Sequence, residues 1–103
     1  MTKLTLDAAH DLISQADETL KPHDLTYAQF RCLHALADRP VNLAALATAL
    51  HISPSSATRM VDRLSARRLV SRKRAPVDHR NVVLTLTPTG STVYGQAREA
   101  LGS

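Results

Sequence analysis

The chain has 103 residues, 44% of them hydrophobic, and a formal net charge of +4 at pH 7, so we expect one small globular domain over residues 1–103. No apolar run approaches the roughly 18 residues of a membrane span and no charged-then-apolar leader indicates export, so a cytoplasmic protein without membrane contact is expected. The single cysteine, Cys32, excludes an intramolecular disulfide and is consistent with a reducing compartment.

The first predicted helix occupies residues 1–21. Apolar residues recur there at three- and four-residue spacings as far as Pro22: Leu6, Ala9, Ile13, Ala16 and Leu20. This heptad-like seam suits pairing with a second helix. An ordinary amphipathic helix packed on its own domain would show the same pattern over about two heptads, and the two roles are compatible.

A second helix is predicted over residues 26–37, where it would serve as a scaffold. Thr26 is placed as its N-cap, and Gln29 completes a capping box. Its inward face is expected to hold Phe30, Leu33 and Leu36 or Ala37. Cys32 on this helix is either a redox sensor or a small buried apolar residue, and the lack of a second cysteine to resolve a sulfenic acid favours burial.

Two further helices follow, one over residues 42–50 and one starting at Ser53. Asn42 would cap the first, which presents an apolar face to the core: Leu43, Leu46, Ala47 and Leu50. Only His51 and Ile52 separate the two helices, which is the short connection of a helix-turn-helix. Many such proteins carry glycine where His51 stands, so we expect a turn that needs no left-handed residue.

The helix that starts at Ser53 has the stronger functional pattern. Ser53 supplies an N-cap hydroxyl and Pro54 takes the first helical position. One face is apolar and must pack inward: Ala57, Met60, Val61 and Leu64. The opposite face gathers hydroxyl and guanidinium groups: Ser55, Ser56, Arg59 and Arg63. Such groups suit the base edges and phosphates of DNA.

Residues 70–87 are predicted to form a β-hairpin. The first strand runs from Val70 to Arg74, a turn-rich segment follows, and the second strand alternates apolar and more polar residues through Val82, Leu84 and Leu86. A helix-turn-helix followed by such a hairpin, called a wing, predicts a mainly α fold with a small β-hairpin wing (α+β), the winged helix-turn-helix.

The tip of the wing carries Asp78, His79 and Arg80. An arginine on a narrow loop can enter a DNA minor groove, where negative potential is concentrated. Asp78 is expected to pair with a nearby arginine and hold the loop. His79 either contacts DNA backbone and gains charge as the pH falls, or is a solvated loop residue.

Basic residues are concentrated in the same part of the chain. Eight of the thirteen lie between residues 59 and 80: Arg59, Arg63, Arg67, Arg68, Arg72, Lys73, Arg74 and Arg80. Residues 1–38 are instead predominantly acidic. A solvated charged face would account for part of this asymmetry, but its coincidence with the helix-turn-helix and wing favours a polyanionic partner and salt-sensitive binding.

Four segments together resemble the MarR family: Leu25 to Phe30, the Ser53 to Leu64 helix, Asp78-His79-Arg80, and Leu86 to Gly90. The resemblance covers most of the chain, and its most specific part is the Asp-x-Arg wing followed by Leu-Thr-x-x-Gly. It implies a homodimeric transcriptional regulator, usually a repressor, that binds a pseudo-palindromic operator. Such proteins often release the operator on binding a small molecule or on oxidation.

The resemblance also suggests how the chain would dimerise. In MarR-like proteins the first helix and the C-terminal helices intertwine, so residues 1–21 and 91–103 are the expected dimerisation helices. Residues 91–103 leave room for one helix with an apolar face: Val93, Tyr94, Ala97 and Leu101. The usual final helix is missing, which indicates either a naturally small member or a truncated one.

Signatures of other functions are absent from the sequence. There is no glycine-rich phosphate loop, HExxH or GxSxG, and three glycines are few for a nucleotide cradle. We therefore expect no enzymatic activity and no cofactor. The histidines are scattered and no cysteine cluster accompanies them, so no metal site is expected: His10, His23, His34, His51 and His79. Few aromatic residues also disfavour single-stranded nucleic acid.

The leading hypothesis is a sequence-specific transcriptional regulator of double-stranded DNA, with the recognition helix in the major groove and the wing in the minor groove. The expected DNA-binding residues are Ser53, Pro54, Ser55, Ser56, Thr58, Arg59, Arg63, Arg72, Arg74, His79 and Arg80, with Asp78 stabilising the wing. A homodimer and a small-molecule effector are the further partners expected. The alternative is a winged-helix protein-interaction module, or an antagonist of a full-length relative, which the short C-terminus motivates.

Overall fold

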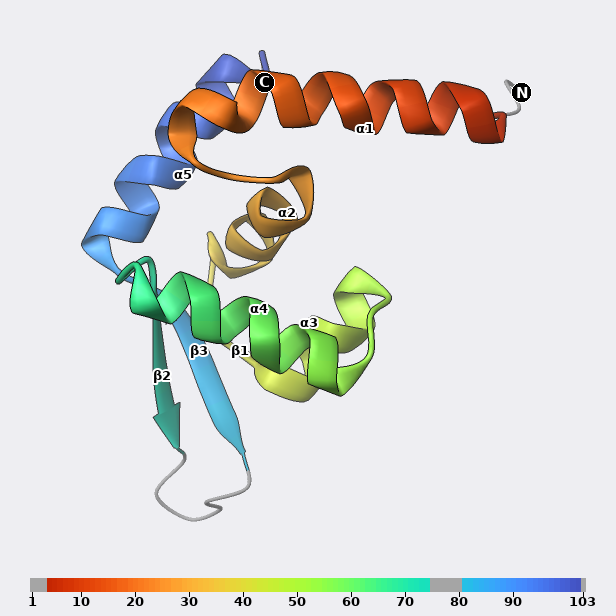
Figure 1. Ribbon diagram of the computed structural model, residues 1–103. Coiled ribbons are helices and arrows are strands. Elements are labelled where there is room, and N and C mark those ends of the chain that lie inside the picture. Colours follow the sequence, from red (N-terminus) through yellow and green to blue (C-terminus); the bar gives the residue numbers. More distant parts are fainter. Residues whose placement is uncertain (1–3, 75–80, 103) are drawn as a thin grey trace.

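A computed structural model describes residues 4–74 and 81–102 of the protein (Figure 1). The helices are α1 (Leu6–Leu20), α2 (Tyr27–Leu36), α3 (Leu43–Leu50), α4 (Pro54–Ala66) and α5 (Pro88–Ala100), with a 3-10 turn, η1 (Lys21–His23), after α1. The strands are β1 (Val41–Asn42), β2 (Val70–Arg74) and β3 (Val82–Leu86). The predicted mainly α winged helix-turn-helix is confirmed.

The strands form one antiparallel sheet in the order β1-β3-β2. β2 and β3 pair from Val70 opposite Leu86 to Arg74 opposite Val82, which is the predicted hairpin. β1, which was not predicted, adds a short third strand with Val41 opposite Leu84. Two residues are too few to show the alternation that identifies a strand in a sequence.

One hydrophobic core joins the helices to the sheet. It contains Leu20, Leu25, Phe30, Cys32, Leu33, Leu36, Leu46, Leu50, Val61, Leu64, Leu69, Val70, Leu84, Tyr94 and Ala97. The predicted inward faces of α2 and α4 supply much of this set, while Met60 lies half-buried at its edge. Burial of these apolar faces fixes the rotation of each helix and therefore decides which side chains of α4 face solvent.

Helix α1 packs on the domain only near its C-terminal end, and its N-terminal half projects beyond the other helices (Figure 1). Leu20 is its one buried residue. Large apolar side chains just before α1 and along it as far as its middle are exposed: Leu4, Leu6, Leu12 and Ile13. Packing on its own domain therefore accounts for only the last part of the heptad-like seam.

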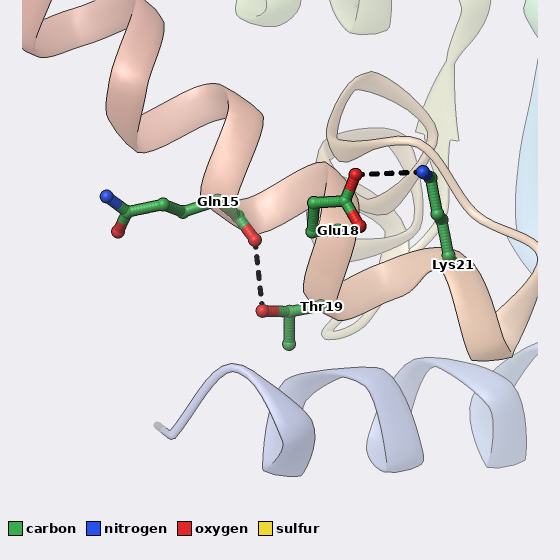
Figure 2. Close-up of polar contacts among 4 residues, drawn as sticks. All are labelled: Gln15, Glu18, Thr19 and Lys21. Carbon is green, nitrogen blue, oxygen red and sulfur yellow. Dashed lines mark hydrogen bonds and ion pairs between the residues drawn. The ribbon is translucent and has the colours of Figure 1, made fainter.

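Exposed polar contacts surround the end of α1 (Figure 2). Lys21 Nζ lies 2.8 Å from Glu18 Oε1, and Thr19 Oγ1 donates to the carbonyl of Gln15 at 3.0 Å. The hydrogen bond and charge of Glu18 raise the pKa of Lys21. Both partners of the ion pair are largely exposed, so the pair contributes little to stability.

The Leu-Thr-x-x-Gly segment joins the sheet to α5 across the end of α4. Thr87 caps α5, with its Oγ1 accepting from the Gly90 N–H at 2.9 Å and donating to the Arg68 carbonyl at 2.6 Å. A Cβ at Gly90 would lie 2.0 Å from the Leu69 carbonyl oxygen. Glycine is therefore required here by the close approach of two backbone segments.

Candidate nucleic-acid interface

The helix-turn-helix consists of α3 and α4, joined through His51, Ile52 and Ser53. His51 adopts a left-handed conformation, with φ 56° and ψ 42°, so the expectation that this turn needs no left-handed residue is wrong. The Ile52 N–H donates to the Ala47 carbonyl at 3.1 Å. This bond closes the end of α3, and it depends on the left-handed conformation of His51.

The start of α4 is fixed by its cap. Ser53 Oγ accepts from the Ser56 N–H at 3.1 Å, and Pro54 occupies the first turn, as predicted. The neighbouring hydroxyls also bond to one another, with Ser53 Oγ 3.2 Å from Ser55 Oγ and 3.0 Å from Ser56 Oγ. Thr58 Oγ1 donates to the Pro54 carbonyl at 3.0 Å. These contacts hold the hydroxyls in place at the exposed end of the helix.

Two arginines extend this polar face along α4. Arg59 and Arg63 are both exposed, and with Ser56 they line a hollow of about 300 Å³ between α4 and the start of α2. Thr26 and Gln29 of the confirmed capping box border its other side. The sequence placed these α2 residues in a scaffold helix, and only the tertiary packing brings them beside the arginines.

The wing strand β2 carries exposed basic residues next to α4. Arg72 forms an ion pair with Asp62 of α4, a contact that the sequence did not predict. Arg74 is exposed at the end of β2. The predicted wing-tip residues Asp78, His79 and Arg80 lie outside the described residues, and the arginine pairing expected for Asp78 lies there too.

Cys32 is fully buried in α2. Burial raises the pKa of its thiol to about 11, which makes the thiolate still scarcer at pH 7 than in an exposed cysteine. Oxidation proceeds through the exposed thiolate. The surroundings of Cys32 therefore favour the packing role over the redox role.

A cavity of about 500 Å³ lies between α2, α3 and α5, on the side of α2 that bears His34. His34 Nδ1 is 2.7 Å from the hydroxyl of Tyr94, and Phe30 stacks on both rings. Two arginines from different helices, Arg31 and Arg98, also line the cavity. Residues 60 positions apart meet here, so periodicity along the chain could not reveal the cavity.

Over residues 4–74 and 81–102, the structure shows no group of three or more histidine, cysteine, aspartate or glutamate side chains that could hold a metal ion. None of the helices in these ranges is both long and apolar enough to cross a membrane.

The sequence profile of the MarR family matches residues 23–81. The HTH-type transcriptional regulator YhbI of Bacillus subtilis is 36% identical over 81 residues, which are 76% of this chain and 51% of YhbI. The transcriptional regulator BldR from Sulfolobus solfataricus superposes with a TM-score of 0.86 at 32% identity, covering 92% of this chain and 69% of BldR. A mutant of MarR from E. coli complexed with operator DNA superposes with a TM-score of 0.80 at 30% identity, covering 94% of this chain and 74% of the MarR chain.

The chain spans about half the length of the curated relatives it matches. The family profile nevertheless takes in more than half of the chain, from the last residue of η1 through the helix-turn-helix and β2 to residue 81, just before β3. The architecture, a three-stranded antiparallel sheet beside a helix-turn-helix, agrees with that match. The chain therefore belongs to the MarR family of winged helix-turn-helix transcriptional regulators.

Proposed function

We propose that this chain binds double-stranded DNA sequence-specifically and acts as a homodimeric transcriptional repressor. The observation that carries the proposal is the exposure of Arg59 and Arg63 on α4, beside the basic strand β2. A helix of this width fits a major groove, and guanidinium forks suit guanine edges and phosphates. The solved complex of the MarR mutant with operator DNA supports the same use of this fold.

In this proposal the residues divide between base reading and positioning. Four residues in the first half of α4 would contact bases: Ser55, Ser56, Thr58 and Arg59. Arg63, Arg72 and Arg74 would contact phosphates, and Ser53 and Pro54 would set the approach of the helix end to the backbone. Arg80 would enter the minor groove, with Asp78 stabilising the wing and His79 near the DNA backbone.

The exposed apolar face of α1 is the proposed dimerisation surface, together with residues 91–103. A hollow of about 290 Å³ on this face is lined by apolar side chains: Leu4, Ala9, Leu12, Ile13, Ala16 and Tyr27. A second copy of α1 would remove these side chains from water. Two-fold symmetry would then place two recognition helices one helical turn, or roughly 34 Å, apart on an inverted repeat.

We also propose that the cavity between α2, α3 and α5 takes a small-molecule effector. Arg31 and Arg98 supply positive charge, and Phe30, Ala35 and Leu50 supply apolar wall. An anion with an apolar body matches this lining.

The test is selection of duplexes from a random pool, with the mass of the complex measured in parallel. An enriched inverted repeat bound by two copies of the chain is expected. The alternative, a protein-interaction module or an antagonist of a longer relative, predicts no enriched sequence and a monomer at micromolar concentration.

A further inference from the structure

The connection between α1 and α2 is held from both sides by contacts that are distant in the sequence. Asp17 of α1 accepts a hydrogen bond from the backbone N–H of Tyr27, the first residue of α2, at 2.6 Å. Arg67, the residue after α4, contacts the same connection. Its Nη1 donates to the Asp24 carbonyl at 2.6 Å and its Nη2 to the His23 carbonyl at 3.5 Å.

The segment that Arg67 grips is itself a tight turn. Asp24 is left-handed, with φ 54°, and its N–H donates to the Lys21 carbonyl at 3.0 Å. Leu25 follows and is buried in the core. The two carbonyls are therefore presented from a fixed backbone, and a planar guanidinium can bond to both of them at once where an ammonium group lacks the fork.

These contacts give Arg67 a role within the protein, where it joins the end of α4 to the connection between α1 and α2. It lies at the end of α4 opposite to the Ser53 cap, and its guanidinium is engaged by protein carbonyls. Helix α4 has 13 residues, or about 20 Å. A small tilt where Arg67 holds its C-terminal end would therefore displace the end that is proposed to read bases.

We propose that Arg67 and Asp17 are positioning residues that couple the orientation of α4 to α1, and so set the spacing between half-sites that a dimer accepts. This inference rests on the proposed function, because α1 is the proposed dimerisation helix and α4 the proposed recognition helix. The junction at residues 20–27 is the shared element: Asp17 fixes it to α1 and α2, and Arg67 fixes it to α4. Loosening either contact frees the recognition helix relative to the dimer axis.

The experiment compares Arg67→Gln with Arg68→Gln in the full chain. Each variant removes one positive charge, and the two positions are adjacent. Affinity is measured on duplexes that carry two selected half-sites at a series of spacings.

Arg67→Gln is expected to lose about 5- to 20-fold in affinity at the preferred spacing and little at the others, so the spacing preference flattens. Arg68→Gln is expected to keep the wild-type preference. Arg67→Lys, which keeps the charge without the fork, should resemble Arg67→Gln.

Asp17→Ala supplies a second route to the same junction. It should flatten the spacing preference as Arg67→Gln does, and the double variant should lose no more than the larger single loss, because both act through one element. Circular dichroism establishes that each variant is folded. Equal spacing profiles for Arg67→Gln and Arg68→Gln would overturn the proposal.

Amide hydrogen exchange without DNA separates this inference from the proposed function. Exchange at Asp24 and Leu25 should quicken in Arg67→Gln and stay at the wild-type rate in Arg68→Gln. If the wild type binds no duplex, the proposed function fails and the coupling to half-site spacing fails with it. Unchanged exchange in Arg67→Gln would show that Arg67 does not hold the junction and would sink the inference even if DNA is bound.

Discussion

Arg59 is the residue on which base recognition is expected to depend most. Arg59→Ala should weaken binding to the selected operator by about 1–3 kcal/mol and relax the base preference, because a bidentate contact to a base edge is lost. Arg72→Ala should weaken binding to all duplexes alike. The loss should be smaller than for an arginine that contacts phosphate alone, because Asp62 already neutralises part of the charge of Arg72. Fluorescence anisotropy on operator and shuffled duplexes measures both. Equal losses on the two duplexes for Arg59→Ala would contradict its assignment to base reading.

Because of Cys32, the free energy of unfolding should fall as the pH rises through the alkaline range. An unfolded chain ionises its thiol near pH 9, whereas burial holds the pKa at about 11 in the folded state. Between these values the unfolded state binds fewer protons, so unfolding becomes easier as the pH rises, by about 2 kcal/mol at pH 11. Urea unfolding of wild type and Cys32→Ala from pH 7 to pH 11 isolates the effect. If the unfolding free energies of wild type and Cys32→Ala changed with pH in the same way, burial would not raise the pKa of the thiol.

The glycines of α5 offer a matched pair of stability variants. Gly90→Ala should destabilise the fold by about 1–3 kcal/mol, because its Cβ would clash with the Leu69 carbonyl. Gly95→Ala, also in α5 with open space around it, should stabilise by about 0.5–1 kcal/mol through helix propensity. Midpoints of urea unfolding should therefore move in opposite directions. A shared direction would refute the close approach at Gly90.

Residue-level prediction from the sequence succeeded where the contact is local. The Thr26 capping box and the Ser53 cap join residues three apart, so the chain spells them out directly. The Arg67 contact with Asp24 spans 43 residues, and no local pattern encodes it. His51 was misread because a residue that seldom adopts a left-handed conformation stands where glycine is common.

At the scale of elements, α1 is expected to hold the dimer together. Ile13→Glu places a charge on its exposed apolar face and should convert the dimer to monomers with the domain still folded. Gln15→Glu, on an exposed position of the same helix, adds the same charge and should leave the dimer intact. Sedimentation velocity across micromolar concentrations measures the outcome. A dimer that survives Ile13→Glu would place the interface elsewhere.

Periodicity predicted the long elements well, because each buries one face against a common core. The stripe of α4 is of this kind, and so is β3, whose Leu84 is buried while Val82 and Leu86 pack against the core. β1 was not predicted, because its two residues are identified as a strand only by their pairing with β3. The hollow between α4 and the start of α2 was not predicted either, because it forms only when the two helices pack together.

Across the whole molecule, acidic and basic residues are concentrated in different segments, the acidic ones in residues 1–38 and the basic ones in residues 59–80. The basic segment falls on α4 and the wing, and the acidic segment falls largely on α1 and its junction with α2. This division should orient the domain toward a polyanion and keep the dimer helices away from it. Binding to any duplex should therefore weaken as salt rises, through release of condensed counterions.

The most direct test of the central claim compares the affinity of the wild-type chain for its selected duplex with that for a shuffled duplex of equal length, at several salt concentrations. We predict that the selected duplex is bound about 1,000-fold more tightly, or more, at physiological salt. Two copies of the chain should bind each selected site. Equal affinity for both duplexes at every salt concentration would contradict sequence-specific regulation and leave a protein that binds DNA only through charge.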